Sequence, residues 1–335
     1  MKIYNIPIFV PHKGCPFDCV FCNQRRITGA TTDVTPQQVK SIIEEHLKTL
    51  PHTNRYVEVA FFGGSFTGIP IEEQSALMEA AAQFGDKIDG IRLSTRPDYI
   101  NDEIMQNLVN HGVTTIELGV QSLDDEVLKK SNRGHTSKQV RDAVEIIRKY
   151  PVRLGLQMMT GLVGDTREKS IYTAREIIAL KPEMVRIYPT LTIKDTYLEK
   201  MYNRGEYIPQ TLEEAIQTVK EIMLMFEKEN IAVIRVGLQS TDQICEEGAV
   251  VAGPVHSAFR ALVESSIYYD LIKEELKGKS GNVCIEVKSS EVSNAVGNKR
   301  ENIKKAKEEL GIALTIKGNE NMNKREVRFC AFKEN

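Results

Sequence analysis

The sequence predicts an α/β protein whose main domain is a partial (β/α)6-type TIM barrel. Short runs rich in β-branched and aromatic residues alternate with longer amphipathic stretches, and this alternation is typical of βαβ units and a parallel sheet. Polar residues recur directly after the short runs, where the predicted strands end. Because such barrels carry their chemistry at the carboxyl ends of the strands, we expect the functional site there.

Seven strands are predicted in the first part of the chain, at Asn5–Val10, Val57–Phe62, Gly90–Ser94, Thr114–Leu118, Arg153–Met158, Met184–Tyr188 and Ile231–Val236. Amphipathic stretches between them predict helices at Pro36–Leu50, Ile71–Phe84, Ser137–Tyr150 and Leu212–Glu229. The first helix has the clearest start signal, because Thr35 can cap it, Pro36 suits its first position and Gln38 can complete a capping box.

The pattern changes near residue 265, which predicts a barrel domain over 1–265 and a small α/β appendage over 266–335. The elements predicted in the appendage are a helix at Ile267–Leu276, a strand at Val283–Val287, a helix at Ser293–Leu310 broken near Gly297, a strand at Ala313–Ile316, a polar loop at Lys317–Arg325 and a strand at Val327–Phe332.

The composition is that of a globular protein, with 41% apolar and 27% charged residues over a length of 335. A formal net charge of -2 gives no overall basic field that would attract nucleic acid, although a local basic patch is compatible with it. No run approaches the roughly 20 apolar residues of a membrane span. The amino-terminal residues lack the features of a signal peptide. We therefore expect a cytoplasmic protein with no membrane partner.

Three cysteines, Cys15, Cys19 and Cys22, follow the first predicted strand with CxxxCxxC spacing. In a cytosolic chain, clustered cysteines indicate metal ligands more than disulfides. Three thiolates would leave one iron of a 4Fe–4S cluster open to a substrate or cofactor. The alternatives are a zinc site, which would need a nearby fourth ligand, and three unrelated core cysteines. The remaining cysteines are scattered and are expected to be buried and inert: Cys245, Cys284 and Cys330.

This motif, with an aromatic residue before its last cysteine, resembles the signature of radical S-adenosylmethionine enzymes. The resemblance implies a 4Fe–4S cluster whose open iron chelates the methionine part of S-adenosylmethionine. It also implies reductive cleavage of that cofactor to a 5′-deoxyadenosyl radical, which abstracts a hydrogen atom from the substrate. A reductant such as flavodoxin or ferredoxin would supply the electron.

Further segments at the predicted strand ends resemble the catalytic subunit of Elongator and, more distantly, oxygen-independent coproporphyrinogen oxidase. By position, the resemblance implies contacts to the cofactor from Phe21, Gly63, Gly64, Ser65, Thr95, Gln121, Arg133, Gln157 and Tyr188. Polar strand-end residues that could contact the substrate are Glu117, His135, Arg186 and Arg235. For the two arginines and Glu117 a structural ion pair is the alternative, and Glu117 could also contact the cofactor ribose.

The appendage carries one further pattern, because Val292–Gly311 resembles the helix-turn-helix of KH modules, which clamp nucleic acid with a GxxG loop. The corresponding loop here, Gly297-Asn298-Lys299-Arg300, lacks the second glycine. The basic residues of this stretch are Lys299, Arg300, Lys304, Lys305 and Lys307. The alternative is an ordinary solvated amphipathic helix.

Two departures from Elongator bear on the substrate. About 70 residues follow the barrel domain, too few for an acetyltransferase domain, so acetyl transfer is not expected. The turns at Gly161–Gly164 and Gly237–Ser240 lack the prolines of short relatives, which indicates either sequence drift or a reshaped pocket. These departures favour a free small molecule over transfer RNA as the substrate. The chain also resembles a short enzyme of this class, queuine lyase, which converts queuine to 7-aminomethyl-7-deazaguanine, and by this resemblance we rank a free 7-deazaguanine base first. The alternatives are an Elongator-like enzyme that modifies a base in transfer RNA and a non-catalytic RNA-binding iron–sulfur protein.

Overall fold

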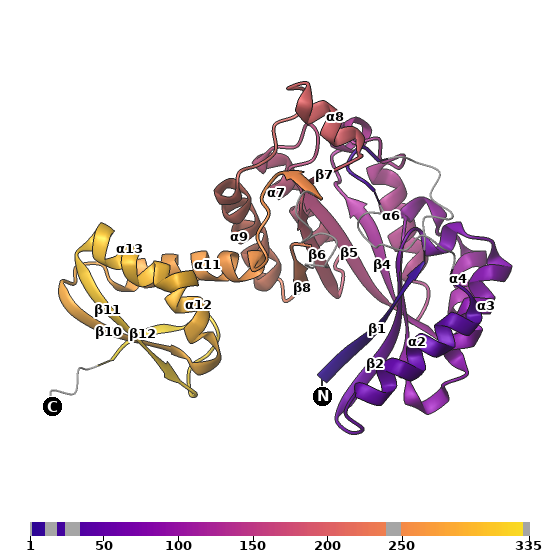
Figure 1. Cartoon of the computed structure of the whole chain (residues 1–335), viewed down its shortest axis with the longest axis horizontal. Coiled ribbons are helices and arrows are strands. Elements are labelled where there is room, and N and C mark those ends of the chain that lie inside the picture. Colours follow the sequence, from indigo (N-terminus) through magenta and orange to yellow (C-terminus); the bar gives the residue numbers. More distant parts are fainter. Residues whose placement is uncertain (1, 11–18, 24–33, 239–248, 331–335) are drawn as a thin grey trace. The chain divides into compact units, whose positions relative to one another are not determined.

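A parallel sheet of seven strands, in the order β1-β2-β3-β4-β5-β6-β8, frames the larger part of the molecule (Figure 1). Its strands are β1 (Lys2–Val10), β2 (Arg55–Gly63), β3 (Gly90–Thr95), β4 (Val113–Gln121), β5 (Arg153–Thr160), β6 (Met184–Pro189) and β8 (Ala232–Val236). The structure is a computed structural model that describes residues 2–10, 19–23, 34–238 and 249–330. Strands that follow one another in the chain are neighbours in the sheet and helices connect them, which confirms the predicted partial barrel.

The helices of this part are α2 (Pro36–Thr49), α3 (Ile71–Ala82), α4 (Asp102–Asn110), α5 (Asp125–Lys130), α6 (Ser137–Ile147), α7 (Arg167–Ala179), α8 (Tyr197–Asn203) and α9 (Leu212–Lys228). All four helices predicted from the sequence are among them. The capping box of α2 is also confirmed, since the Gln38 backbone N–H donates to Thr35 Oγ1 at 3.3 Å and the Thr35 N–H donates to Gln38 Oε1 at 2.8 Å. A small antiparallel pair of strands, β7 (Thr192–Ile193) and β9 (Val250–Ala252), was not predicted.

The sheet is buried on both faces, but the two faces differ in chemistry. On β4 the buried apolar residues Ile116 and Leu118 alternate with the buried polar residues Thr115 and Glu117. Because successive side chains of a strand point to opposite faces, one face of the sheet is apolar and the other carries charges. The charged face is the one on which a polar site can form.

The chain divides into two compact units, Met1–Thr211 with Ile222–Val255 and Leu212–Glu221 with His256–Asn335. The division after Val255 precedes the sequence-based boundary at residue 265, because the helix α11 (Phe259–Glu275) starts before the predicted Ile267 and belongs wholly to the second unit. The predicted domain boundary itself stays a prediction. Among the helices in the described ranges, none combines the length and the hydrophobicity that a bilayer span requires.

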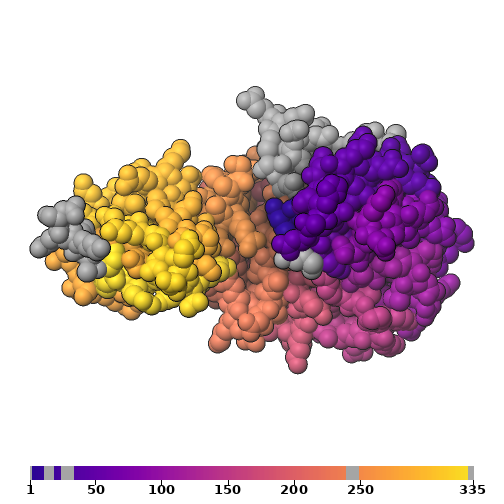
Figure 2. Space-filling view, turned by 90° about the horizontal axis from the view of Figure 1, so that it is seen from below, coloured from indigo at the N-terminus to yellow at the C-terminus, as the bar shows by residue number. Residues whose placement is uncertain are grey.

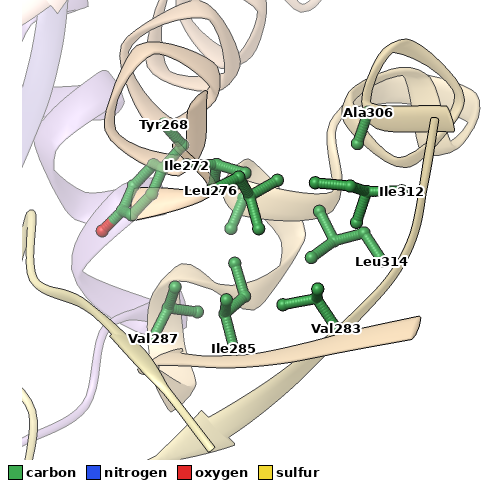
Figure 3. Close-up of a cluster of buried hydrophobic side chains, with 10 residues drawn as sticks. Tyr268, Ile272, Leu276, Val283, Ile285, Val287, Ala306, Ile312 and Leu314 are labelled. Carbon is green, nitrogen blue, oxygen red and sulfur yellow. The ribbon is translucent and has the colours of Figure 1, made fainter. Parts of the chain in front are cut away.

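The second unit packs helices on a sheet of three strands in the order β11-β10-β12. Its other elements are β10 (Gly281–Lys288), α12 (Val292–Val296), α13 (Glu301–Leu310), β11 (Ile312–Asn319) and β12 (Val327–Phe329). Strand β10 is parallel to β11 and antiparallel to β12. Figure 3 shows its core, in which Tyr268, Ile272 and Leu276 of α11 face apolar side chains of β10 and β11.

One prediction for this unit is confirmed and another is wrong. The break near Gly297 is confirmed, since this glycine has φ 79° and separates α12 from α13. The polar loop predicted from Lys317 is wrong at its start, because β11 continues to Asn319 and pairs along its whole length with β10. Pairing with a neighbouring strand overrides the low β-propensity of the polar residues there.

Cys284 is buried, as expected, but a disulfide between Cys284 and Cys330, with a Cα–Cα distance of 5.3 Å, was not predicted. They are 46 residues apart in the sequence, and the antiparallel pairing of β10 with β12 brings them together. Such a pairing of distant strands cannot be read from cysteine spacing. Cys245 lies outside the described residues.

Candidate active site

A cavity of about 130 Å³ lies at the carboxyl ends of the strands β2 to β5, beside the short described segment 19–23. Ten residues that the sequence predicted for the cluster or the cofactor line it: Cys19, Phe21, Cys22, Gly63, Gly64, Ser65, Thr95, Gln121, Arg133 and Gln157. Three further lining residues, Ser94, Arg96 and Gly119, were missed. A signal for them existed, because Ser94 and Arg96 flank the predicted Thr95 and Gly119 lies between Glu117 and Gln121 on the same strand.

The cysteine motif is described only in part, since Cys15 lies outside the described residues. Cys19 is buried and Cys22 is half-buried. Among the residues that the structure describes, no three His, Cys, Asp or Glu side chains gather closely enough to hold a metal ion. The two described cysteines nevertheless lie on one cavity, and the complete three-cysteine ligand set stays a prediction.

The edge of the cavity needs glycine at two places. Gly63 has φ 110°, and a Cβ atom there would lie 2.5 Å from the backbone oxygen of Val10. A Cβ atom on Gly119 would lie 2.8 Å from Arg133 Nη2. At Gly63 a methyl group would collide with backbone, whereas at Gly119 it would displace the end of the Arg133 side chain, so both glycines allow a close approach around the cavity.

Hydroxyl groups form a buried cluster on another wall. Thr95 Oγ1 lies 2.9 Å from Ser65 Oγ and 2.6 Å from Thr67 Oγ1, and all three side chains are buried. The Arg96 backbone N–H also donates to Ser65 Oγ at 3.3 Å. These contacts fix the strand end of β3 against the turn after β2, so this wall is held in one arrangement.

Several polar atoms of the cavity have unmet hydrogen-bonding capacity. Gln121 Oε1 and Arg133 Nε are buried and have no partner among the described residues. Gln121 also has a positive φ of 65°, which is strained for a non-glycine residue. Other atoms of Arg133 are engaged, since Nη2 donates to the Gly119 oxygen at 2.7 Å and Nη1 lies 3.6 Å from Cys19 Sγ. Unmet buried groups of both kinds fit a polar ligand that carries donors and acceptors.

Five charged side chains of β2, β3, β4, β5 and β6 form a chain of ion pairs in which positive and negative groups alternate. Their order is Arg153, Glu58, Arg92, Glu117 and Arg186, and we call this set the charge row. Arg92 joins the two carboxylates, at 2.8 Å from Glu58 and 2.9 Å from Glu117. Arg153 lies 2.6 Å from Glu58, and Arg186 pairs with Glu117. Both carboxylates are fully buried, so the row satisfies charges that burial would otherwise make very costly.

Glu117 was predicted to contact the substrate, with a structural ion pair as the alternative. The structure shows the ion pair. Burial raises the pKa of this carboxyl, but hydrogen bonds and charge from Arg186 and Arg92 outweigh it and lower the pKa below its ordinary value. Oε1 accepts from Arg92 and Arg186, and Oε2 accepts from Arg186 and Gln157. These four bonds use the whole accepting capacity of the carboxylate, so none is left for a substrate.

The remaining predicted residues lie outside the cavity lining. Tyr188 contacts Arg186, whose guanidinium also lies over the Phe62 ring at 5.3 Å. Arg235 on β8 is the register partner of Arg186, and its role toward an anion stays a prediction. His135 is buried with Nε2 3.2 Å from the Val120 oxygen.

The protonation state of His135 follows from its surroundings. Burial, with the nearby charges of Arg133 and Arg96, lowers its pKa to about 3. The imidazole is therefore neutral at pH 7, and its Nε2 donates to the Val120 carbonyl. Its Nδ1 is buried and has no partner among the described residues, so the predicted role of His135 toward a substrate stays a prediction.

The chain matches two family models and resembles several known proteins. The model of the radical SAM superfamily matches residues 9–177, half of the chain, and that of the radical SAM C-terminal domain matches residues 182–269. A tRNA uridine(34) acetyltransferase of Methanocaldococcus jannaschii is 30% identical over 54% of this chain and 38% of its own length. Elongator complex protein 3 of Schizosaccharomyces pombe is 27% identical over 54% of this chain and 37% of its own length.

Solved structures show the same fold. The archaeal Elp3 of Methanocaldococcus infernus superposes with a TM-score of 0.63 and 24% identity, covering 82% of this chain and 64% of that one. Coproporphyrinogen III oxidase of Escherichia coli superposes with a TM-score of 0.51 and 15% identity, over 68% of this chain and 53% of that one. The chain thus spans about two fifths of the two sequence relatives, and the structural likeness concerns the fold.

The family and the cavity agree on the cofactors. Enzymes of this superfamily use a 4Fe–4S cluster and S-adenosylmethionine, which together supply a carbon-centred radical. Cys19 and Cys22 offer thiolates, and the unmet groups of Gln121 and Arg133 suit the polar parts of S-adenosylmethionine. With this family model over half of its length and a cavity that fits these cofactors, the chain belongs to the radical S-adenosylmethionine superfamily.

Proposed function

We propose that this radical S-adenosylmethionine enzyme modifies a nucleobase within transfer RNA. The observation that carries the proposal is a groove in the second unit, with a volume of about 590 Å³. We call it the basic groove. It is lined by Asn282, Arg300, Ile303, Lys304, Lys307, Ile312, Ala313, Leu314 and Thr315. Figure 2 shows the surface of this unit, residues 256–330, in orange to yellow.

The lining of the basic groove has the chemistry that a nucleic acid strand needs. Three cations, Arg300, Lys304 and Lys307, come from α13 and the turn before it, and no carboxylate is among the lining residues. The opposite wall comes from β11, on which Ala313 and Thr315 are exposed while Ile312 and Leu314 belong to the core. Cations suit phosphates, so the groove complements the backbone of an RNA strand.

The structure distinguishes these cations from their neighbours on the same stretch. Lys305 pairs with Glu301 at 2.7 Å and lies over the Tyr269 ring, and neither Lys305 nor Lys299 lines the groove. With a net charge of only -2 for the whole chain, attraction to RNA has to come from such a local cluster. Of the five basic residues noted in the sequence, three line the groove and two do not.

The curated relatives support the same substrate class. One of them is named tRNA uridine(34) acetyltransferase, and another is named Elongator complex protein 3. The matched region is only 38% and 37% of those proteins, so the proposal takes over the RNA substrate and not the acetyl transfer. A one-electron reductant such as flavodoxin or ferredoxin is part of the proposal, since reductive cofactor cleavage requires an electron.

The test compares substrates by the formation of 5′-deoxyadenosine in anaerobically reconstituted protein. We expect transfer RNA to stimulate this formation and the triple variant R300A/K304A/K307A to lose the stimulation. The logarithm of the binding constant for transfer RNA should fall linearly with the logarithm of the salt concentration. In the triple variant this slope should be smaller by about 2, because each lost phosphate contact removes about 0.7. The matched control is K299A/K305A, which removes two cations outside the groove and should keep most of the response.

Queuine lyase remains the second candidate, and the same experiment decides between the two. Free queuine would then stimulate 5′-deoxyadenosine formation and yield 7-aminomethyl-7-deazaguanine, while transfer RNA would not. The triple groove variant would respond to queuine like the unaltered protein. That pair of results would replace the RNA proposal.

A further inference from the structure

The side-chain amide of Gln157 links the cofactor cavity to the charge row. Gln157 lines the cavity, and its Nε2 lies 3.2 Å from both Ser94 Oγ and Glu117 Oε2. An amide nitrogen has two hydrogens, so these two acceptors use its donating capacity completely. The contact with Glu117 is the one that reaches into the charge row.

The charge of Glu117 decides which way this amide is turned. Glu117 is ionised, because Arg92 and Arg186 surround it, and an ionised carboxylate only accepts hydrogen bonds. If the amide were flipped, the carbonyl oxygen of Gln157 would lie about 3.2 Å from that carboxylate and would be repelled. The nitrogen therefore faces Glu117, and the opposite orientation is excluded by charge.

The other end of the amide is then left for a ligand. In the described part of the chain no donor bonds to Gln157 Oε1, and the side chain is at the cavity wall. Nearby Gln121 Oε1 also lacks a partner. The cavity thus presents carbonyl oxygens, which bind hydroxyl or ammonium groups. S-adenosylmethionine carries both kinds of group.

We propose that Glu117 is a positioning residue for the cofactor: it fixes the amide of Gln157 so that Oε1 accepts a hydrogen bond from S-adenosylmethionine. The charge row holds Glu117 in turn, through Arg92 and Arg186. Glu117 touches neither substrate nor cofactor in this arrangement. The inference rests on family membership and the cavity and is independent of whether the substrate is RNA or a free base.

The test measures the dissociation constant of S-adenosylmethionine by anaerobic calorimetry on cluster-loaded protein. Gln157→Met keeps the length of the side chain and the charge row but removes the acceptor, and we expect binding to weaken about three- to tenfold. Glu117→Gln should weaken binding to a similar extent, because its amide no longer imposes one orientation. In the Gln157→Met background, Glu117→Gln should have no further effect on binding.

The matched control is Glu58→Gln, which removes the other carboxylate of the charge row without any contact to Gln157. A purely structural role would make the two carboxylate variants weaken the cofactor equally, and that result would overturn the proposal. Additive losses in the double variant would do the same. Should Glu117→Gln not fold, Gln157→Met still decides, because unchanged cofactor affinity in that variant contradicts a hydrogen bond from Oε1.

Discussion

Replacing Gly63 by alanine tests the close approach of two strand ends at the cavity. At φ 110° this residue occupies a region that other residues avoid, and the new Cβ would lie 2.5 Å from the Val10 oxygen. That same oxygen accepts the Gly64 N–H at 3.0 Å. The substitution therefore forces either the backbone of residue 63 or the end of β1 to move.

The expected loss can be worked from these contacts. Strained backbone costs about 1–3 kcal/mol, and loss of the Gly64 hydrogen bond adds about 1 kcal/mol, so the free energy of unfolding should fall by about 2–4 kcal/mol. The control is Gly112→Ala, at φ 79° with no atom within 4 Å of the new Cβ. It carries the backbone cost alone, about 1 kcal/mol.

The assay is urea unfolding of both variants and the unaltered protein, followed by circular dichroism. Calorimetry on the cluster-loaded protein would show whether Gly63→Ala also weakens S-adenosylmethionine, as expected if the turn lines its cavity. If Gly63→Ala costs no more than Gly112→Ala, the two strand ends can separate freely. The reasoning from close approach would then be wrong.

Three other outcomes follow from the site and the second unit. Cys19→Ala and Cys22→Ala should each prevent anaerobic reconstitution to about four irons per chain, whereas Cys284→Ser should retain the iron, as iron analysis would show. The pKa of His135 in the folded protein is about 3, below its ordinary value of about 6.5. The free energy of unfolding should therefore fall as the pH is lowered from about 6.5 toward 3, because the unfolded protein binds a proton that the folded protein does not. Acid titration of His135→Gln should show a smaller fall over this interval. Cys330→Ser opens a 46-residue disulfide loop and should lower the stability of the second unit by up to about 4 kcal/mol, measured by thermal unfolding with and without reductant.

The barrel strands could be predicted because their signals are local. Buried parallel strands are nearly continuous apolar runs, and polar residues mark where each run ends. Ser65, Thr95 and Gln121 line the cavity, and they were expected there because the segments that contain them resemble the catalytic subunit of Elongator. The cysteine spacing, likewise, is a property of a few consecutive residues.

Contacts between distant residues could not be predicted in the same way. The sequence left open whether Glu117 meets a substrate or an arginine, because the answer depends on Arg92 and Arg186 on the two other strands. The disulfide between Cys284 and Cys330 depends on the pairing of two strands. Which lysines line the basic groove depends on the rotation of α13, and a basic composition alone does not give that rotation.

The charge row also limits how such an enzyme can be redesigned or can evolve. Each of its carboxylates lies between two guanidinium groups, so replacing either carboxylate by a neutral residue leaves buried positive charge without its partner. Viable changes should come as compensated pairs, and homologous sequences should show these positions varying together. Arg235 is the register partner of Arg186 on the last strand and is not a member of the row, so its replacement should not disturb these ion pairs.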